Sequence, residues 1–131
     1  MNRLLRHLLT LAFVGVTAVH LAGLYWPRVE LPGDAPNTDK WVHLVAFGVP
    51  VALGWLRFRR HRWWLVAAFA AHGPLSELLQ GTVLPHRSGD PLDAVADLVG
   101  VAVGVLVGLA GDTLTRDTLT SGKLTREKAH I

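Results

Sequence analysis

The chain has 131 residues, a formal net charge of +3 and a mean hydropathy of +0.33, and half of its residues are apolar. Its length favours one domain, and the lack of cysteine excludes disulfides, thiolate metal sites and cysteine nucleophiles. The basic residues flank apolar blocks instead of forming one basic face, which argues against nucleic-acid binding.

The first apolar block, about residues 8–26, predicts a membrane-spanning helix. A span needs about 20 apolar residues, and this block follows Arg3 and Arg6 and ends in the interfacial pair Tyr25-Trp26. A cleaved signal peptide has a shorter apolar region and a small-residue cleavage site. We therefore expect this first helix to be retained.

Three further blocks predict three more spanning helices, at about residues 41–58, 63–84 and 91–111. A proline-rich loop precedes the second helix, and a short arginine-rich hairpin separates the second from the third. The fourth helix carries a glycine ridge that is suited to close helix packing and consists of Gly100, Gly104, Gly108 and Gly111.

The sequence thus predicts an all-α membrane protein with a four-helix membrane domain, residues 1–111, and a short polar cytoplasmic tail, residues 112–131. Of the 13 basic residues, only Arg28, Lys40 and Arg87 fall on the side opposite the two termini. The positive-inside rule then places both termini in the cytoplasm, with the chain crossing the membrane four times.

Acidic and other polar residues gather at the outer side. Glu77 and Asp97 lie about two turns inside their helices, where a charge costs about 2.5–3.5 kcal/mol on insertion scales and so faces a partner or water. Spacings of three or four residues place polar pairs on one helix face. We predict a buried network or a wet cavity that opens outward and consists of Asp39, Lys40, His43, Glu77, Gln80, Arg87, Asp90, Asp93 and Asp97.

The segments that carry this pattern are Asp39-Lys40-x-x-His43-x-x-x-Phe47, Glu77-x-x-Gln80 and Arg87-x-x-Asp90-x-x-Asp93-x-x-x-Asp97-x-x-Gly100. In order and spacing they resemble the VanZ-like family of bacterial membrane proteins, over about residues 39–104. The resemblance implies a four-helix membrane domain, and the founding members of the family are linked to resistance to teicoplanin, a lipoglycopeptide. Many members carry Asn where this chain has Asp97, so the extra acid disfavours a neutral network or implies a protonated carboxyl.

The favoured functional hypothesis is an outer site that binds a lipid-linked or amphipathic envelope ligand, with Arg87 pairing with its phosphate or carboxylate. The expected partners are membrane lipids or lipid-linked envelope precursors. The alternative is a membrane-embedded hydrolase or transferase acting on a lipid, with Glu77 or Asp97 as general base and His43 oriented by Asp39. A third reading gives the cluster a purely structural role, and an ion conductor is a weaker fourth.

We predict no cofactor and no metal site. His43, Glu77, Asp93 and Asp97 are plausible metal donors, but the chain has no close ligand motif such as H-E-x-x-H. Two other histidines receive no functional role: His20 is expected at the membrane interface, and His72 as a polar group satisfied beside Gly73-Pro74.

Overall fold

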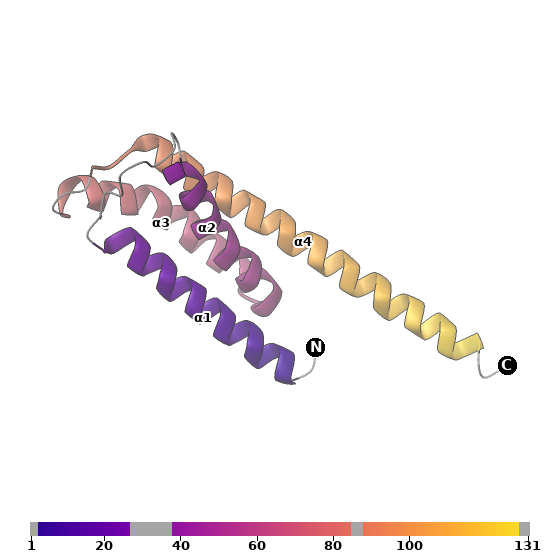
Figure 1. Ribbon diagram of the computed structural model, residues 1–131. Coiled ribbons are helices and arrows are strands. Elements are labelled where there is room, and N and C mark those ends of the chain that lie inside the picture. The colour runs from indigo at the N-terminus through magenta and orange to yellow at the C-terminus, as the bar shows by residue number, and fades with distance from the viewer. Residues whose placement is uncertain (1–2, 27–37, 85–87, 129–131) are drawn as a thin grey trace.

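The computed structural model describes residues 3–26, 38–84 and 88–128, with side chains described up to residue 114. Every element in this part of the chain is an α-helix, which confirms the all-helical class (Figure 1). The helices are α1 (Arg3–Tyr25), α2 (Thr38–Arg57), α3 (Arg62–Thr82) and α4 (Pro91–Lys128).

The fourth helix is longer than the predicted span. It runs without a break from Pro91 to Lys128, so the part of the predicted polar tail that is described, residues 112–128, continues the helix. The change from apolar to polar residues after Gly111 predicts the end of the membrane span, but no proline follows Pro91 to end the helix. Polarity ends a membrane span, whereas only a backbone break or a cap ends the helix itself.

Consecutive helices run in opposite directions, and α4 lies along α2 (Figure 1). The glycine ridge makes this close contact possible, as predicted. A Cβ added to Gly104 would lie 2.5 Å from the carbonyl oxygen of Gly48 and 2.8 Å from Cβ of Val51. A Cβ added to Gly108 would lie 2.5 Å from the ring of Trp55. No side chain fits between the two helices at these positions.

Polar side chains occupy much of the interior, and large apolar side chains cover the outside. The buried apolar residues are Leu24, Phe47, Val51, Trp55 and Val101, whereas the buried polar or charged residues are His20, Ser76, Glu77, Gln80, Asp93, Asp97 and Asp112. Leu11, Val19 and Trp64 are among the many large apolar side chains that are more than two-thirds exposed, at 69%, 73% and 79%. A soluble domain avoids such a continuous apolar exterior.

Within the described residues, α1 and the segment Pro91–Leu114 of α4 are long and apolar enough to cross a membrane. Only 11% of the apolar stretch of α1 and 28% of that of α4 is buried, whereas a core helix of a soluble protein would be mostly buried. These two helices indicate membrane association.

The end of the bundle that contains the α2–α3 hairpin is held together by Asp112 of α4. Its buried carboxylate accepts hydrogen bonds from Trp55 Nε1 at 3.2 Å, from Arg62 at 2.7 Å and from Arg59. The guanidinium of Arg62 also lies 4.5 Å from the ring centre of Trp55. Two of the hairpin arginines therefore pair within the protein.

Candidate functional site

At the opposite end of the bundle, the first turns of α2 and α4 meet around Lys40. Its ammonium donates to Asp39 at 3.2 Å, to Asp90 at 3.0 Å and to Asp93 at 2.9 Å. The charge of Lys40 is thus shared among three carboxylates, and this pairing joins the start of α2 to the start of α4.

Asp90 holds the turn that leads into α4. One of its carboxylate oxygens accepts the backbone N–H of Leu92 at 2.9 Å, and its own N–H donates to Glu77 Oε2 at 2.9 Å. The hydrogen bond from Leu92, together with that from Lys40, holds the pKa of Asp90 below its ordinary value of 3.8. The Asp90 carboxylate therefore stays ionised, while the backbone N–H of Asp90 fixes the orientation of the Glu77 carboxylate.

Deeper in the bundle, His43 of α2 faces acids from α3 and α4. Its Nδ1 lies 2.8 Å from Asp97 Oδ1 and 3.9 Å from Glu77 Oε1, and its Nε2 lies 3.8 Å from Asp93 Oδ2. One imidazole therefore lies among three carboxylates, within a shell in which every side chain is at most 12% exposed. Each of the three helices contributes at least one of these groups.

Two carboxylate oxygens in this inner shell are buried without a hydrogen-bond partner, namely Glu77 Oε1 and Asp97 Oδ2. The close approach of α3 to Asp97 depends on Gly73, because a Cβ at that position would lie 2.9 Å from Cβ of Asp97. Buried carboxylate oxygens without partners are costly, and a proton, a cation or a polar ligand group bound in this shell would remove that cost.

The structure brings together seven of the nine predicted site residues: Asp39, Lys40, His43, Glu77, Asp90, Asp93 and Asp97. Gln80 is buried on α3, one turn after Glu77. Arg87 lies outside the described residues. One detail of the prediction is wrong: Asp97, not Asp39, binds His43, because the side chain of Asp39 contacts Lys40 instead.

A second polar group links α1 to α3. Tyr25 OH lies 2.9 Å from Nε2 of His72, whose Nδ1 lies 3.3 Å from Nε2 of His20. His20 is only 4% exposed and packs edge-on against Phe47, so its ring lies inside the bundle, and its predicted position at the membrane interface stays a prediction. The available signal was a histidine inside each of two apolar helices, because intramembrane ionisable residues usually have a partner.

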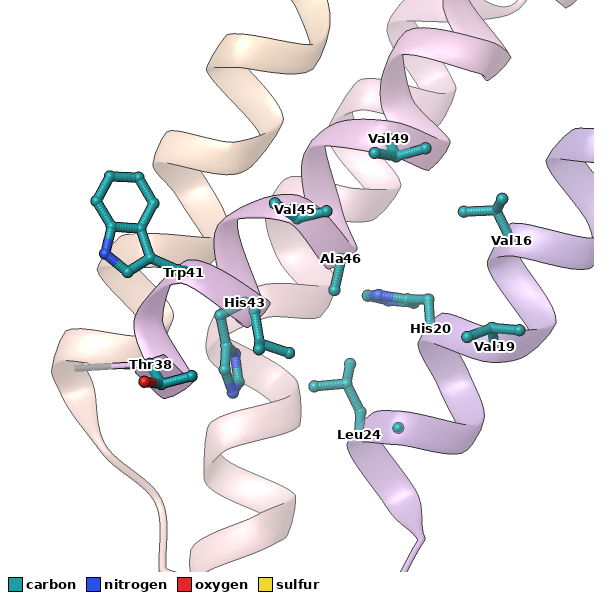
Figure 2. Close-up of a pocket in the computed structure, with 12 residues that line it drawn as sticks. Val16, Val19, His20, Leu24, Thr38, Trp41, His43, Val45, Ala46 and Val49 are labelled. Atoms are coloured by element: carbon teal, nitrogen blue, oxygen red, sulfur yellow. The ribbon is translucent and has the colours of Figure 1, made fainter. Parts of the chain in front are cut away.

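An apolar groove of about 620 Å³ lies between α1 and α2 (Figure 2). Val16, Val19 and Leu24 line it from α1, and Val45 and Val49 line it from α2. The groove also includes the two histidines, His20 and His43, and Figure 2 shows the ring of His20 directed toward α2. His43 therefore belongs both to the groove and to the carboxylate shell.

No family model, curated protein or solved structure matches this chain.

Proposed function

We propose that the chain is a VanZ-like integral membrane protein whose four helices all cross the bacterial cytoplasmic membrane, with both termini in the cytoplasm. The apolar exterior, the buried polar interior and the alternating helix directions support this topology. So does the charge asymmetry, since the hairpin arginines lie at one end and the carboxylate shell at the other.

The topology can be tested directly because the chain has no cysteine. A cysteine introduced by Ser88→Cys, between α3 and α4, should react with a membrane-impermeant maleimide in intact cells. A cysteine introduced by Ser121→Cys should react only after the membrane is permeabilised. The opposite pattern, or equal labelling of both variants, would contradict the proposed orientation.

We further propose that the outer site binds a lipid-linked or amphipathic ligand of the cell envelope. The observation that carries this proposal is the shared position of His43, which lines the apolar groove and also contacts the buried carboxylates. A hydrocarbon chain fits the groove, whose volume of about 620 Å³ is within the roughly 300–1,000 Å³ typical of ligand sites. The polar head of the same molecule would then lie at the shell.

Lipid binding can be measured by native mass spectrometry of the purified chain with added polyprenyl phosphate. Val19→Trp fills the groove and should weaken binding at least tenfold, whereas Val14→Trp adds the same bulk to an exposed position of α1 that is not among the groove residues. Equal binding by the two variants would exclude the groove as the site of the hydrocarbon chain.

The family resemblance extends this proposal to teicoplanin resistance. Expression of the chain in a susceptible strain should raise the inhibitory concentration of teicoplanin more than that of a glycopeptide without an acyl chain, because only the former presents a hydrocarbon tail. Glu77→Gln should abolish this difference while the amount of protein in the membrane is unchanged. A loss that merely follows reduced abundance would favour a structural role for the cluster.

The contact between His43 and Asp97 favours a second candidate, a membrane-embedded hydrolase or transferase. A carboxylate 2.8 Å from Nδ1 fixes the imidazole ring, and Glu77 supplies a buried oxygen that can accept a proton. In this candidate Glu77 or Asp97 acts as general base on a lipid substrate. Release of labelled product from polyprenyl phosphate or phospholipid, lost in Glu77→Gln with binding retained, would distinguish an enzyme from a binding protein.

A further inference from the structure

We propose that His43, Glu77 and Asp97 form a binding site for one divalent transition-metal ion, such as Zn²⁺ or Mn²⁺. Each residue comes from a different helix, and each offers a donor atom that lies within 4.8 Å of the other two. Donors bound to one tetrahedral Zn²⁺ at about 2.0–2.2 Å are about 3.3–3.6 Å apart. The separations from His43 Nδ1, 2.8 Å to Asp97 Oδ1 and 3.9 Å to Glu77 Oε1, lie on either side of this range.

The inner shell has an excess of negative charge. Lys40 is already bonded to Asp39, Asp90 and Asp93. Its charge is therefore shared outside the inner trio, which consists of His43, Glu77 and Asp97. The inner trio itself contains two carboxyl groups and one imidazole. A divalent cation would neutralise both carboxylates in a place from which water is largely excluded.

The buried oxygens provide a second and independent observation. Glu77 Oε1 and Asp97 Oδ2 have no hydrogen-bond partner, and the side chains that carry them are only 7% and 1% exposed. Unpaired oxygens at such depth are rare in folded proteins because each has lost its hydration. An ion bound between Glu77, Asp97 and His43 would give both carboxylates a partner at once.

The surrounding groups orient the three donors in the way that metal sites require. Glu77 is held through Oε2 by the backbone N–H of Asp90, which leaves Oε1 to bind the ion. An ion on Nδ1 of His43 would replace the hydrogen bond from Nδ1 to Asp97 and leave the ring proton on Nε2. Asp93 Oδ2 lies 3.8 Å from Nε2, so a shift of about 0.5 Å would bring the two atoms within hydrogen-bonding distance, and Asp93 is fixed by Lys40. A carboxylate that supports the second ring nitrogen is the usual outer partner of a metal-bound histidine.

The donor types indicate the class of ion. An imidazole nitrogen together with carboxylate oxygens suits Zn²⁺ or Mn²⁺, whereas Mg²⁺ and Ca²⁺ prefer oxygen ligands alone. The neighbouring acidic trio of Asp39, Asp90 and Asp93 is a less suitable site, because the ammonium of Lys40 bonds to all three of its members. Asp39 therefore provides a matched control, since it is acidic and close but not a predicted ligand.

The test is a titration of the purified full-length chain in detergent with the metal alone, using calorimetry for Zn²⁺ and the electron paramagnetic resonance signal of free Mn²⁺. We expect one ion per chain and a much weaker response to Mg²⁺. Glu77→Gln and His43→Asn should each weaken binding at least tenfold, whereas Asp39→Asn should leave the affinity within about twofold of wild type.

A variant is compared with the wild type only if the two have the same unfolding temperature in the presence of chelator, and either Glu77→Gln or His43→Asn is sufficient for the test. If both variants unfold, the test uses the wild type alone: Zn²⁺ should protect Glu77 and Asp97 against labelling by a carbodiimide. Absence of stoichiometric binding by the wild type, equal loss in Asp39→Asn, or no protection would overturn the proposal. The titration contains no lipid, so its outcome is independent of the lipid-binding assay. Binding of the ion without binding of polyprenyl phosphate would refute the proposed lipid-binding function and leave the metal site standing.

Discussion

The contact between α2 and α4 makes a quantitative prediction for Gly104→Ala. The added Cβ would lie 2.5 Å from the backbone oxygen of Gly48, whereas ordinary contacts begin near 3.4 Å, so the helices must separate by about 0.9 Å. A backbone oxygen cannot rotate away as a side chain can. Overpacking of this kind costs about 1–3 kcal/mol, partly because a gap of 0.5–1 Å forfeits a quarter to a half of each dispersion contact.

Gly15→Ala on α1 is the matched control, because a Cβ at Gly15 would meet nothing within 4 Å. Both substitutions gain the same helix propensity, roughly 1 kcal/mol, so the difference between the two variants isolates the packing cost. The free energy of unfolding can be followed in mixed micelles by the fluorescence of the five tryptophans. A difference of less than about 0.5 kcal/mol, the usual error of additivity, would refute the argument.

Three other substitutions test the polar contacts. Asp112→Asn should lower the free energy of unfolding by about 2 kcal/mol in the same assay, since it removes a charge-assisted bond to the partly buried Arg62, while the more exposed Arg59 contributes little. Tyr25→Phe should cost about 1 kcal/mol through the lost bond to His72, and His72→Ala should cancel the effect of Tyr25→Phe in a double-mutant cycle. Because the folded-state pKa of Asp90 lies below its ordinary 3.8, its charge stabilises the fold above about pH 4, and this contribution is lost as the pH falls through the folded-state pKa. Asp90→Asn should therefore lower the melting temperature at pH 7, and this loss should shrink as the pH falls below about 4; an equal loss at every pH would exclude the charge as the cause.

Much of the fold follows from composition and spacing. The apolar blocks located all four helices, and the glycine spacing identified a face of α4 suited to close packing, which in the structure lies against α2. The extent of α4 was missed because hydropathy reports where a helix can lie in lipid, not where its backbone hydrogen bonds stop. Asp112 shows the same limitation, since a residue assigned to the polar tail is a buried partner of the hairpin arginines.

The site was predictable as a set of residues but not as a set of contacts. Helical spacing placed Asp39 and His43 on one face of a helix. It could not show that Asp97, which lies on another helix and 54 residues after His43, is the acid that contacts the imidazole. The pairing of His20 with His72 was missed for the same reason. Contacts between helices depend on the rotation of each helix about its axis, and one sequence does not determine that rotation.

The glycine ridge and the carboxylate shell depend on one another. His43 lies five residues before Gly48 on α2, and Asp97 lies three residues before Gly100 on α4. A Cβ on Gly48 would be 3.0 Å from the backbone oxygen of Gly100. An aspartate side chain is short, so it reaches an imidazole on the next helix at 2.8 Å only where the two backbones come this close. A separation of about 0.9 Å, as expected for Gly104→Ala, would carry this pair toward about 3.7 Å and beyond hydrogen-bonding distance. The small residues therefore do more than stabilise the bundle, because they set the distance at which its buried acids and histidine can act together.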